Sequence, residues 1–88
     1  MLTDARGIPS GTVLEREVCV VGAGAAGIAL ALELAGARFR VALLESGGLE
    51  PEPETEDLSR GRVYGRAYPP LHEVRTRRFG GSTWCWDG

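Results

Sequence analysis

A glycine-rich turn between two apolar segments constrains this chain more than any other feature. Residues 17–21, Glu-Val-Cys-Val-Val, predict a strand that runs directly into Gly-Ala-Gly-Ala-Ala-Gly at residues 22–27. In such a turn the first glycine permits the tight bend, the second lets backbone approach a diphosphate, and the third lets a helix pack closely on the strand. The pattern therefore predicts a dinucleotide-binding turn built on Gly22, Gly24 and Gly27.

The residues that follow complete a β-α-β unit. Residues 25–35 are rich in alanine and leucine, which favour a helix, and Gly36 provides a stop signal. The free amides at the start of such a helix favour a bound anion. A second apolar strand is predicted over residues 39–44, and it ends at Glu45, where a carboxylate is expected to meet the ribose 2′-hydroxyl of an adenine dinucleotide.

A structural turn with no ligand is the competing interpretation, since glycine accounts for 13 of the 88 residues. The complete order of strand, turn, helix, second strand and acidic residue favours nucleotide binding instead. We therefore expect an α/β fold containing a Rossmann-like FAD/NAD(P)-binding β-α-β unit.

Both faces of the predicted strand pair are apolar. The first face carries Val18, Val20, Val41 and Leu43, and the second carries Cys19, Val21, Ala42 and Leu44. Parallel sheets are normally covered on both faces, and one short helix covers only one. We therefore expect residues 1–88 to be a partial domain, the N-terminal part of a larger doubly wound parallel sheet, with the rest of that domain and the substrate domain absent.

Composition narrows the class of protein further. The net charge is −2, so no basic surface indicates nucleic acid as a partner. The sequence contains no apolar run of about eighteen residues and no secretory signal, which predicts a cytoplasmic protein. Cys19 and Cys85 have no metal-binding or redox spacing. We expect Cys19 to be a buried thiol in the first strand, and a reducing compartment disfavours a disulfide between the two.

The remaining segments are assigned from their glycine, proline and charged residues. Residues 1–15 are expected to be a flexible leader, and residues 49–70 a connector. The acidic, proline-containing stretch at residues 50–57 predicts an extended, solvated backbone, with a cation site as the alternative. Residues 75–79 predict a short strand that leads into Gly-Gly-Ser-Thr at residues 80–83.

Three of these segments together resemble the glucose–methanol–choline (GMC) family of flavoprotein oxidoreductases. They are Val-Val-Gly-Ala-Gly-Ala-Ala-Gly (20–27), Leu-Glu-Ser-Gly-Gly (44–48) and Arg-Phe-Gly-Gly-Ser-Thr (78–83). The sequence looks closest to the bacterial branch similar to pyranose oxidases and membrane-associated sugar dehydrogenases. The resemblance implies FAD as the cofactor and a parent enzyme that acts on CH–OH donors, moving hydride from a sugar or other alcohol to the flavin. The catalytic apparatus of such enzymes is not within these residues, so we expect the chain alone to be inactive.

The resemblance also implies which residues contact FAD. The glycine turn and the first amides of the helix would face the pyrophosphate, and the acidic end of the second strand would face the ribose: Gly22, Gly24, Ala25, Ala26, Gly27, Glu45 and Ser46. The second glycine pair would lie against the flavin end: Gly80, Gly81, Ser82 and Thr83. No catalytic residue and no metal ligand is assigned.

The sequence departs from the GMC pattern just beyond this pair. Trp84 and Cys85 occupy the places where related sequences often have Asn and His, whereas Trp86 and Gly88 match. Without that histidine, histidyl attachment of the flavin at this site is impossible. Cys85 is then either a small side chain near a noncovalent flavin or the residue whose sulfur forms a covalent cysteinyl–flavin bond. The two tryptophans would flank the flavin ring or pack in a core.

Other polar residues are weaker candidates. His72 is the only histidine, and its proline-rich setting predicts a solvated loop more than a catalytic base. Arg75, Arg77 and Arg78 would contact either a phosphate or the anionic part of the flavin, or form salt links to the acidic connector.

Two other functions stay open at this point. One is a different flavin- or nicotinamide-dependent enzyme with two dinucleotide sites, such as an amine oxidase or a disulfide-reductase-like protein. Glu45 argues against NADP, because a carboxylate repels a 2′-phosphate. The other is a non-catalytic, truncated nucleotide-binding fragment. The substrate, the electron acceptor and any membrane partner are not assigned by the sequence.

Overall fold

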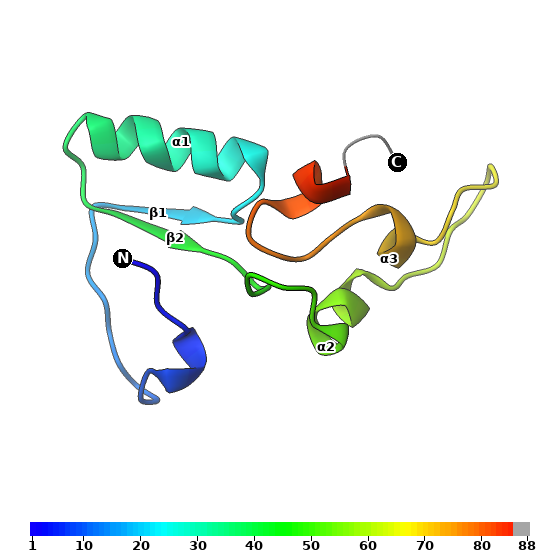
Figure 1. Cartoon of the computed structure of the whole chain (residues 1–88), viewed down its shortest axis with the longest axis horizontal. Helices are drawn as coiled ribbons and strands as arrows, with labels where there is room; N and C mark the ends of the chain where they lie inside the picture. The colour runs from blue at the N-terminus through cyan, green and yellow to red at the C-terminus, as the bar shows by residue number, and fades with distance from the viewer. Residues whose placement is uncertain (86–88) are drawn as a thin grey trace.

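A parallel β-α-β unit is the main element of the computed structural model, which describes residues 1–85. Strand β1 (Val18–Val21) is followed by helix α1 (Ala25–Gly36) and then by strand β2 (Val41–Leu44). The strands pair in parallel, with Val18 opposite Val41 and Val21 opposite Leu44. Figure 1 shows α1 lying along one face of this pair. The predicted unit and its division into two faces are confirmed.

Helix α1 packs on the strands through residues three or four apart. Gly27, Ile28, Ala31 and Leu34 are its partly buried positions, which place them on one side of a helix with 3.6 residues per turn. The predicted stop at Gly36 is wrong in detail, because α1 includes that glycine. The left-handed residue after the helix is Arg38, with φ of 68°, and its amide donates to the Ala35 carbonyl oxygen at 3.0 Å.

The buried core is small. Among the described residues, Val20 and Ala23 are the only buried hydrophobic ones. The radius of gyration is 15.2 Å, whereas a compact chain of this length would have about 12 Å. This core supports the turn between β1 and α1 and little else.

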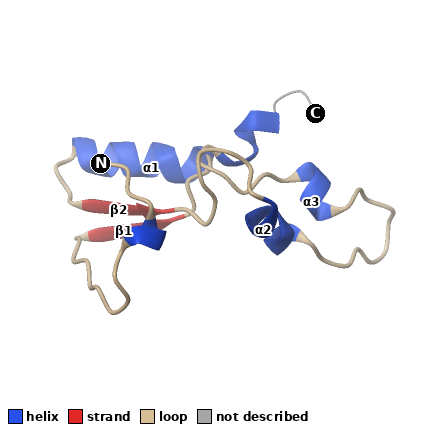
Figure 2. Ribbon diagram, turned by 60° about the horizontal axis from the view of Figure 1, so that its bottom comes forward, coloured by secondary structure: helices blue, strands red, loops and turns tan. Residues whose placement is uncertain are grey.

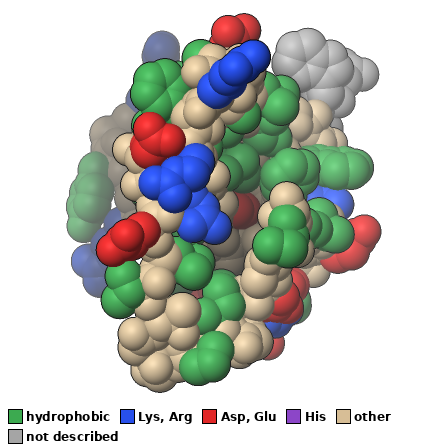
Figure 3. Space-filling model, turned by 90° about the vertical axis from the view of Figure 1, so that its left-hand side faces the viewer, with side chains coloured by type: hydrophobic (Ala, Val, Ile, Leu, Met, Phe, Trp, Pro, Cys, Tyr) green, Lys and Arg blue, Asp and Glu red, His purple; other side chains and the backbone are tan. Residues whose placement is uncertain are grey.

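The second face of the sheet is open to solvent. Val21 is 81% exposed and Leu44 52%, and Cys19 is also exposed. The prediction that Cys19 is buried is therefore wrong, because no described element covers its face. Both cysteines are free. Figure 3 shows hydrophobic side chains on the surface beside acidic and basic ones.

Beyond the β-α-β unit the chain forms short helical turns. These are η1 (Ala5–Gly7), α2 (Pro53–Glu56), η2 (Asp57–Ser59), α3 (Leu71–Val74) and η3 (Gly81–Cys85). In Figures 1 and 2, α2 and α3 lie beyond the carboxyl ends of the two strands. In the described residues no helix has the length and apolar character needed to cross a membrane.

Two local predictions differ from the structure. The acidic stretch is not extended throughout, because Pro53 occupies the first turn of α2 and the Glu52 carbonyl oxygen accepts from the amides of Thr55 and Glu56. His72 likewise lies in α3 and not in a loop. Both corrections arise from one-turn helices that are too short to produce a periodic sequence signal.

The predicted strand at residues 75–79 is also absent from the described fold. This segment bonds to the side chain of Glu56 in α2 and to the loop after β2, and it forms no ladder with a neighbouring strand. The Arg77 amide donates to Glu56 Oε1 at 2.9 Å, and the Phe79 amide donates to the Gly48 carbonyl oxygen at 2.9 Å. These bonds bring the segment to the ends of the strands. Trp86 and Gly88, which match the GMC pattern, lie outside the described residues.

Candidate functional site

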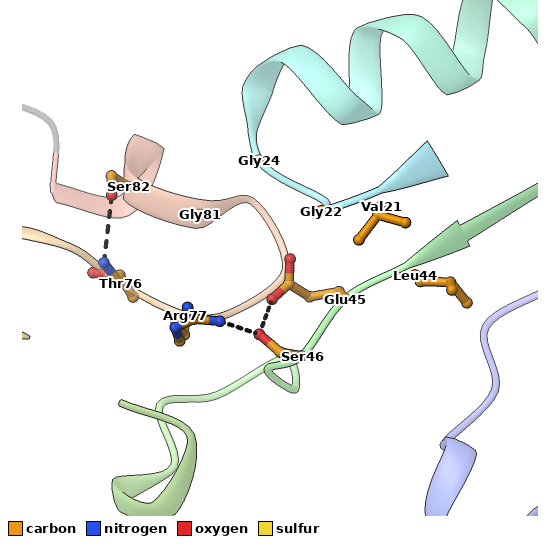
Figure 4. Close-up of a pocket in the computed structure, with 10 residues that line it drawn as sticks. All are labelled: Val21, Gly22, Gly24, Leu44, Glu45, Ser46, Thr76, Arg77, Gly81 and Ser82. Atoms are coloured by element: carbon orange, nitrogen blue, oxygen red, sulfur yellow. Dashed lines mark hydrogen bonds between the residues drawn. The ribbon is translucent and has the colours of Figure 1, made fainter. Parts of the chain in front are cut away.

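A cleft of about 540 Å³ lies at the carboxyl ends of β1 and β2 (Figure 4). Its volume is in the range of small-molecule sites. In open α/β sheets ligands bind in this place, outside the carboxyl ends of the strands. Three segments line it, the glycine turn, the end of β2 and the chain around the second glycine pair: Val21, Gly22, Gly24, Leu44, Glu45, Ser46, Thr76, Arg77, Gly81 and Ser82.

The glycine turn has the backbone geometry that a diphosphate site requires. Gly22 has a φ of 99°, a left-handed conformation that favours glycine. A methyl group on Gly24 would meet no atom within 4 Å, so this cleft-lining residue offers its bare side to a ligand. A methyl group on Gly27 would overlap the Gly22 carbonyl oxygen, which shows how closely α1 approaches the turn. Gly22 and Gly27 therefore have the turn and the close helix packing predicted for them, and the contact of Gly24 with a diphosphate stays a prediction.

Glu45 connects the second strand to the glycine turn. Its Oε2 accepts from the Ala23 amide at 2.8 Å, and its Oε1 accepts from the Gly47 amide at 2.9 Å and from the Ser46 hydroxyl at 3.1 Å. Partial burial raises the pKa of this carboxyl group. The hydrogen bonds from the Gly47 and Ala23 amides and from Ser46 outweigh burial, so the pKa lies below its ordinary value of 4.5. The cleft therefore carries an ionised carboxylate at neutral pH.

This pKa shift gives a pH-dependent stability. Because the Glu45 pKa is lower in the folded than in the unfolded chain, its contribution is fully present above the unfolded value and is lost as pH falls through the folded value. We expect Glu45→Gln to be less stable than the unmodified chain at neutral pH, with the difference shrinking below pH 4.5. Urea unfolding followed by circular dichroism across this range measures it. A difference that stays constant with pH would contradict the assignment.

The second glycine pair packs directly on the first turn. The Gly80 amide donates to the Ala23 carbonyl oxygen at 2.8 Å. Gly81 has a φ of 57°, and a methyl group on it would lie 3.0 Å from the Gly24 Cα. Glycine at position 81 thus lets two backbones meet at one end of the cleft, whereas a methyl group on Gly80, whose φ is 93°, would meet the Trp84 side chain.

The two cleft-side arginines have different partners. The Arg77 guanidinium donates to the hydroxyls of Ser46 at 3.0 Å and Ser59 at 3.1 Å. Arg78 is buried, donates to the Leu49 carbonyl oxygen, and lies 3.6 Å from the Glu50 carboxylate and 3.9 Å from the Trp84 ring centroid. The predicted salt link to the acidic connector therefore holds for Arg78.

The structure brings together most of the residues predicted from sequence. Six of them line the cleft: Gly22, Gly24, Glu45, Ser46, Gly81 and Ser82. Ala25 and Ala26 form the first turn of α1, directly after Gly24. Thr83 lies away from the lining and caps its own turn, with its hydroxyl donating to the Gly80 carbonyl oxygen at 2.6 Å.

Sequence reasoning did not assign three lining residues, Val21, Leu44 and Thr76. Val21 and Leu44 are the last residues of the two strands, and this position could have indicated that they line a site at the carboxyl ends of the strands. Thr76 had no local signal. Its amide lies 3.4 Å from the Ser82 hydroxyl, and its own hydroxyl lies 2.9 Å from Cys85 Sγ.

Comparison with known families is consistent with this geometry. Residues 17–80 match the family model described as FAD dependent oxidoreductase (DAO). The matched region begins just before β1 and ends at Gly80, so it contains the glycine turn, Glu45 and the first residue of the second glycine pair. Searches of curated proteins and of solved structures gave no match to the chain.

Proposed function

The chain belongs to the FAD dependent oxidoreductase family, and we propose that its cleft holds the ADP half of FAD. The observation that carries this proposal is the bond between the Ala23 amide and Glu45 Oε2, at 2.8 Å. It brings an ionised carboxylate to the glycine turn at the mouth of one cleft. A diphosphate at the turn and a ribose at Glu45 are adjacent parts of one adenosine diphosphate.

The residues of the chain then act by binding and orienting. The free amides of the first turn of α1, together with the positive end of its dipole, stabilise the diphosphate charge. The bare side of Gly24 lets the diphosphate approach the backbone. Glu45 accepts a hydrogen bond from the ribose and repels any 2′-phosphate. FAD itself, when bound, supplies the capacity to accept a hydride.

The substrate class belongs to the proposal as well. Oxidation of an alcohol group of the GMC type is favoured by the Gly80–Gly81 pair, which packs on Ala23 and Gly24 as a flavin-side glycine motif would. The family match supports the alternative, a different flavin-dependent oxidoreductase, more directly than it supports the GMC assignment. In either case we propose that residues 1–15 are a leader and residues 49–70 a connector. We also propose that the substrate site lies outside residues 1–88.

Ligand competition tests the proposal. In a calorimetric titration of the full chain, we expect FAD and ADP to bind at the same site, because both contain the diphosphate and the ribose. Riboflavin lacks both groups and is expected not to displace ADP. Failure of FAD and ADP to compete, or displacement of ADP by riboflavin, would show that the cleft does not hold the ADP half.

A further inference from the structure

A directed chain of hydrogen bonds runs from Arg77 through Ser46 to Glu45 at the edge of the cleft (Figure 4). Arg77 Nη1 donates to Ser46 Oγ at 3.0 Å, and Ser46 Oγ donates to Glu45 Oε1 at 3.1 Å. A guanidinium only donates and an ionised carboxylate only accepts, so the direction of the serine hydroxyl between them is fixed. Arg77 therefore determines which way the Ser46 proton points.

The Arg77 side chain is held in place for this contact. Its Nε donates to Ser59 Oγ at 3.1 Å, and its backbone amide donates to Glu56 Oε1 at 2.9 Å. Among residues 1–85, no carboxylate oxygen lies within 4.0 Å of its guanidinium nitrogens. The charge of Arg77 therefore acts first on the two serine hydroxyls, and it polarises the Ser46 O–H bond toward Glu45.

The Glu45 carboxylate has few acceptor positions left. An ionised carboxylate offers about four lone-pair positions. The Gly47 amide and the Ser46 hydroxyl occupy the two positions of Oε1, and the Ala23 amide occupies one of the two on Oε2. The Ser46 amide adds a weaker interaction that also lowers the Glu45 pKa. The position that remains suits one further donor from a ligand in the cleft. Fixing Ser46 on Oε1 therefore decides where that donor must lie.

We propose that Arg77 is a positioning residue for ribose recognition: through Ser46 it orients Glu45 so that the free acceptor position faces the ribose 2′-hydroxyl. This inference rests on the proposed function and names the residue that sets its preference for ribose over 2′-deoxyribose. Arg77 itself does not contact the ribose in this scheme. Loss of Arg77 should reduce the preference for a ribose ligand over its 2′-deoxyribose analogue more than it reduces the affinity for both ligands.

The test compares ADP with 2′-deoxy-ADP by calorimetric titration of the full chain. The unmodified chain is expected to prefer ADP by about tenfold, the effect of one hydrogen bond to a charged group. Arg77→Met is expected to reduce that preference to about threefold or less, because Ser46 is then free to turn away from Glu45. Arg75→Met is the matched control. Arg75 lies in the same segment, is exposed and does not line the cleft, so the preference should be unchanged.

A double-mutant cycle separates this role from simple packing. Ser46→Ala should reduce the preference for ADP as much as Arg77→Met does, and combining the two should reduce it no further. If circular dichroism shows that Arg77→Met does not fold, Ser46→Ala alone decides, since it leaves the Ala23 and Gly47 bonds to Glu45 in place.

Three results would overturn the inference. Equal loss of affinity for both ligands in Arg77→Met would show that Arg77 only maintains the structure. An unchanged ADP preference in Ser46→Ala would show that the serine does not orient Glu45. If the unmodified chain bound neither ligand, the proposed function itself would fail and this inference with it.

Discussion

Gly27→Ala is expected to lower the free energy of unfolding by about 3 kcal/mol, the upper part of the range for overpacking a tight contact. The added methyl group would overlap the Gly22 carbonyl oxygen, and it would lie 3.0 Å from the Gly22 carbonyl carbon and 3.6 Å from Val20 Cγ1. A backbone carbonyl cannot rotate away as a flexible side chain can. Helix α1 would have to move off β1, the strand that provides Val20 to the small core. Urea unfolding followed by circular dichroism measures the loss.

Gly36→Ala is the matched control for this prediction. It is the same substitution in the same helix, but a methyl group there meets no atom within 4 Å. Alanine is the better helix former, so the variant should be as stable as the unmodified chain or more stable by up to about 1 kcal/mol. Equal stability of the two alanine variants would show that α1 does not approach the turn as closely as the structure indicates.

The parts of the fold that sequence predicts are those with local signals. Two short, continuous apolar runs predict both strands, and the two-residue period of a strand divides each run into two faces. The parallel register keeps Val20 and Leu43 on the same face. The glycine spacing predicts the turn, since Gly22 has a left-handed backbone that favours glycine and Gly27 lies too close to the Gly22 carbonyl oxygen for a side chain. Glu45 is predicted because it directly follows the second strand. Each of these features depends on residues that lie next to one another in the sequence or within the same short segment.

The parts that sequence does not predict depend on distant residues. Arg77 meets Ser59 and Ser46, which lie 18 and 31 positions away, and no local pattern indicates either pairing. The sequence of residues 75–79 predicts a strand, but the bonding partners of this segment are the Glu56 side chain of α2 and the Gly48 carbonyl oxygen of the loop after β2. Arg38 shows the same limit at short range, because the left-handed residue after α1 lies two positions beyond Gly36, the predicted helix stop.

Gly24→Val is expected to abolish most nucleotide binding while leaving the fold intact. Gly24 is not left-handed, and a Cβ atom there meets nothing within 4 Å, so the valine is accommodated in the absence of ligand. Its branched side chain would then occupy the space in which a diphosphate approaches the first amides of α1. We expect the affinity for ADP to fall at least about a hundredfold, or about 2.7 kcal/mol. Calorimetric titration measures it.

Gly7→Val is the control for this substitution. Gly7 also has open space around its Cα, but it lies in η1, away from the cleft. Its affinity for ADP should equal that of the unmodified chain, and circular dichroism should show the same helix content in all three proteins. Valine at the start of α1 costs up to about 1 kcal/mol of stability as a poor cap, which is too little to explain a hundredfold loss of binding. If Gly24→Val bound ADP normally, the diphosphate would have to lie somewhere other than the glycine turn.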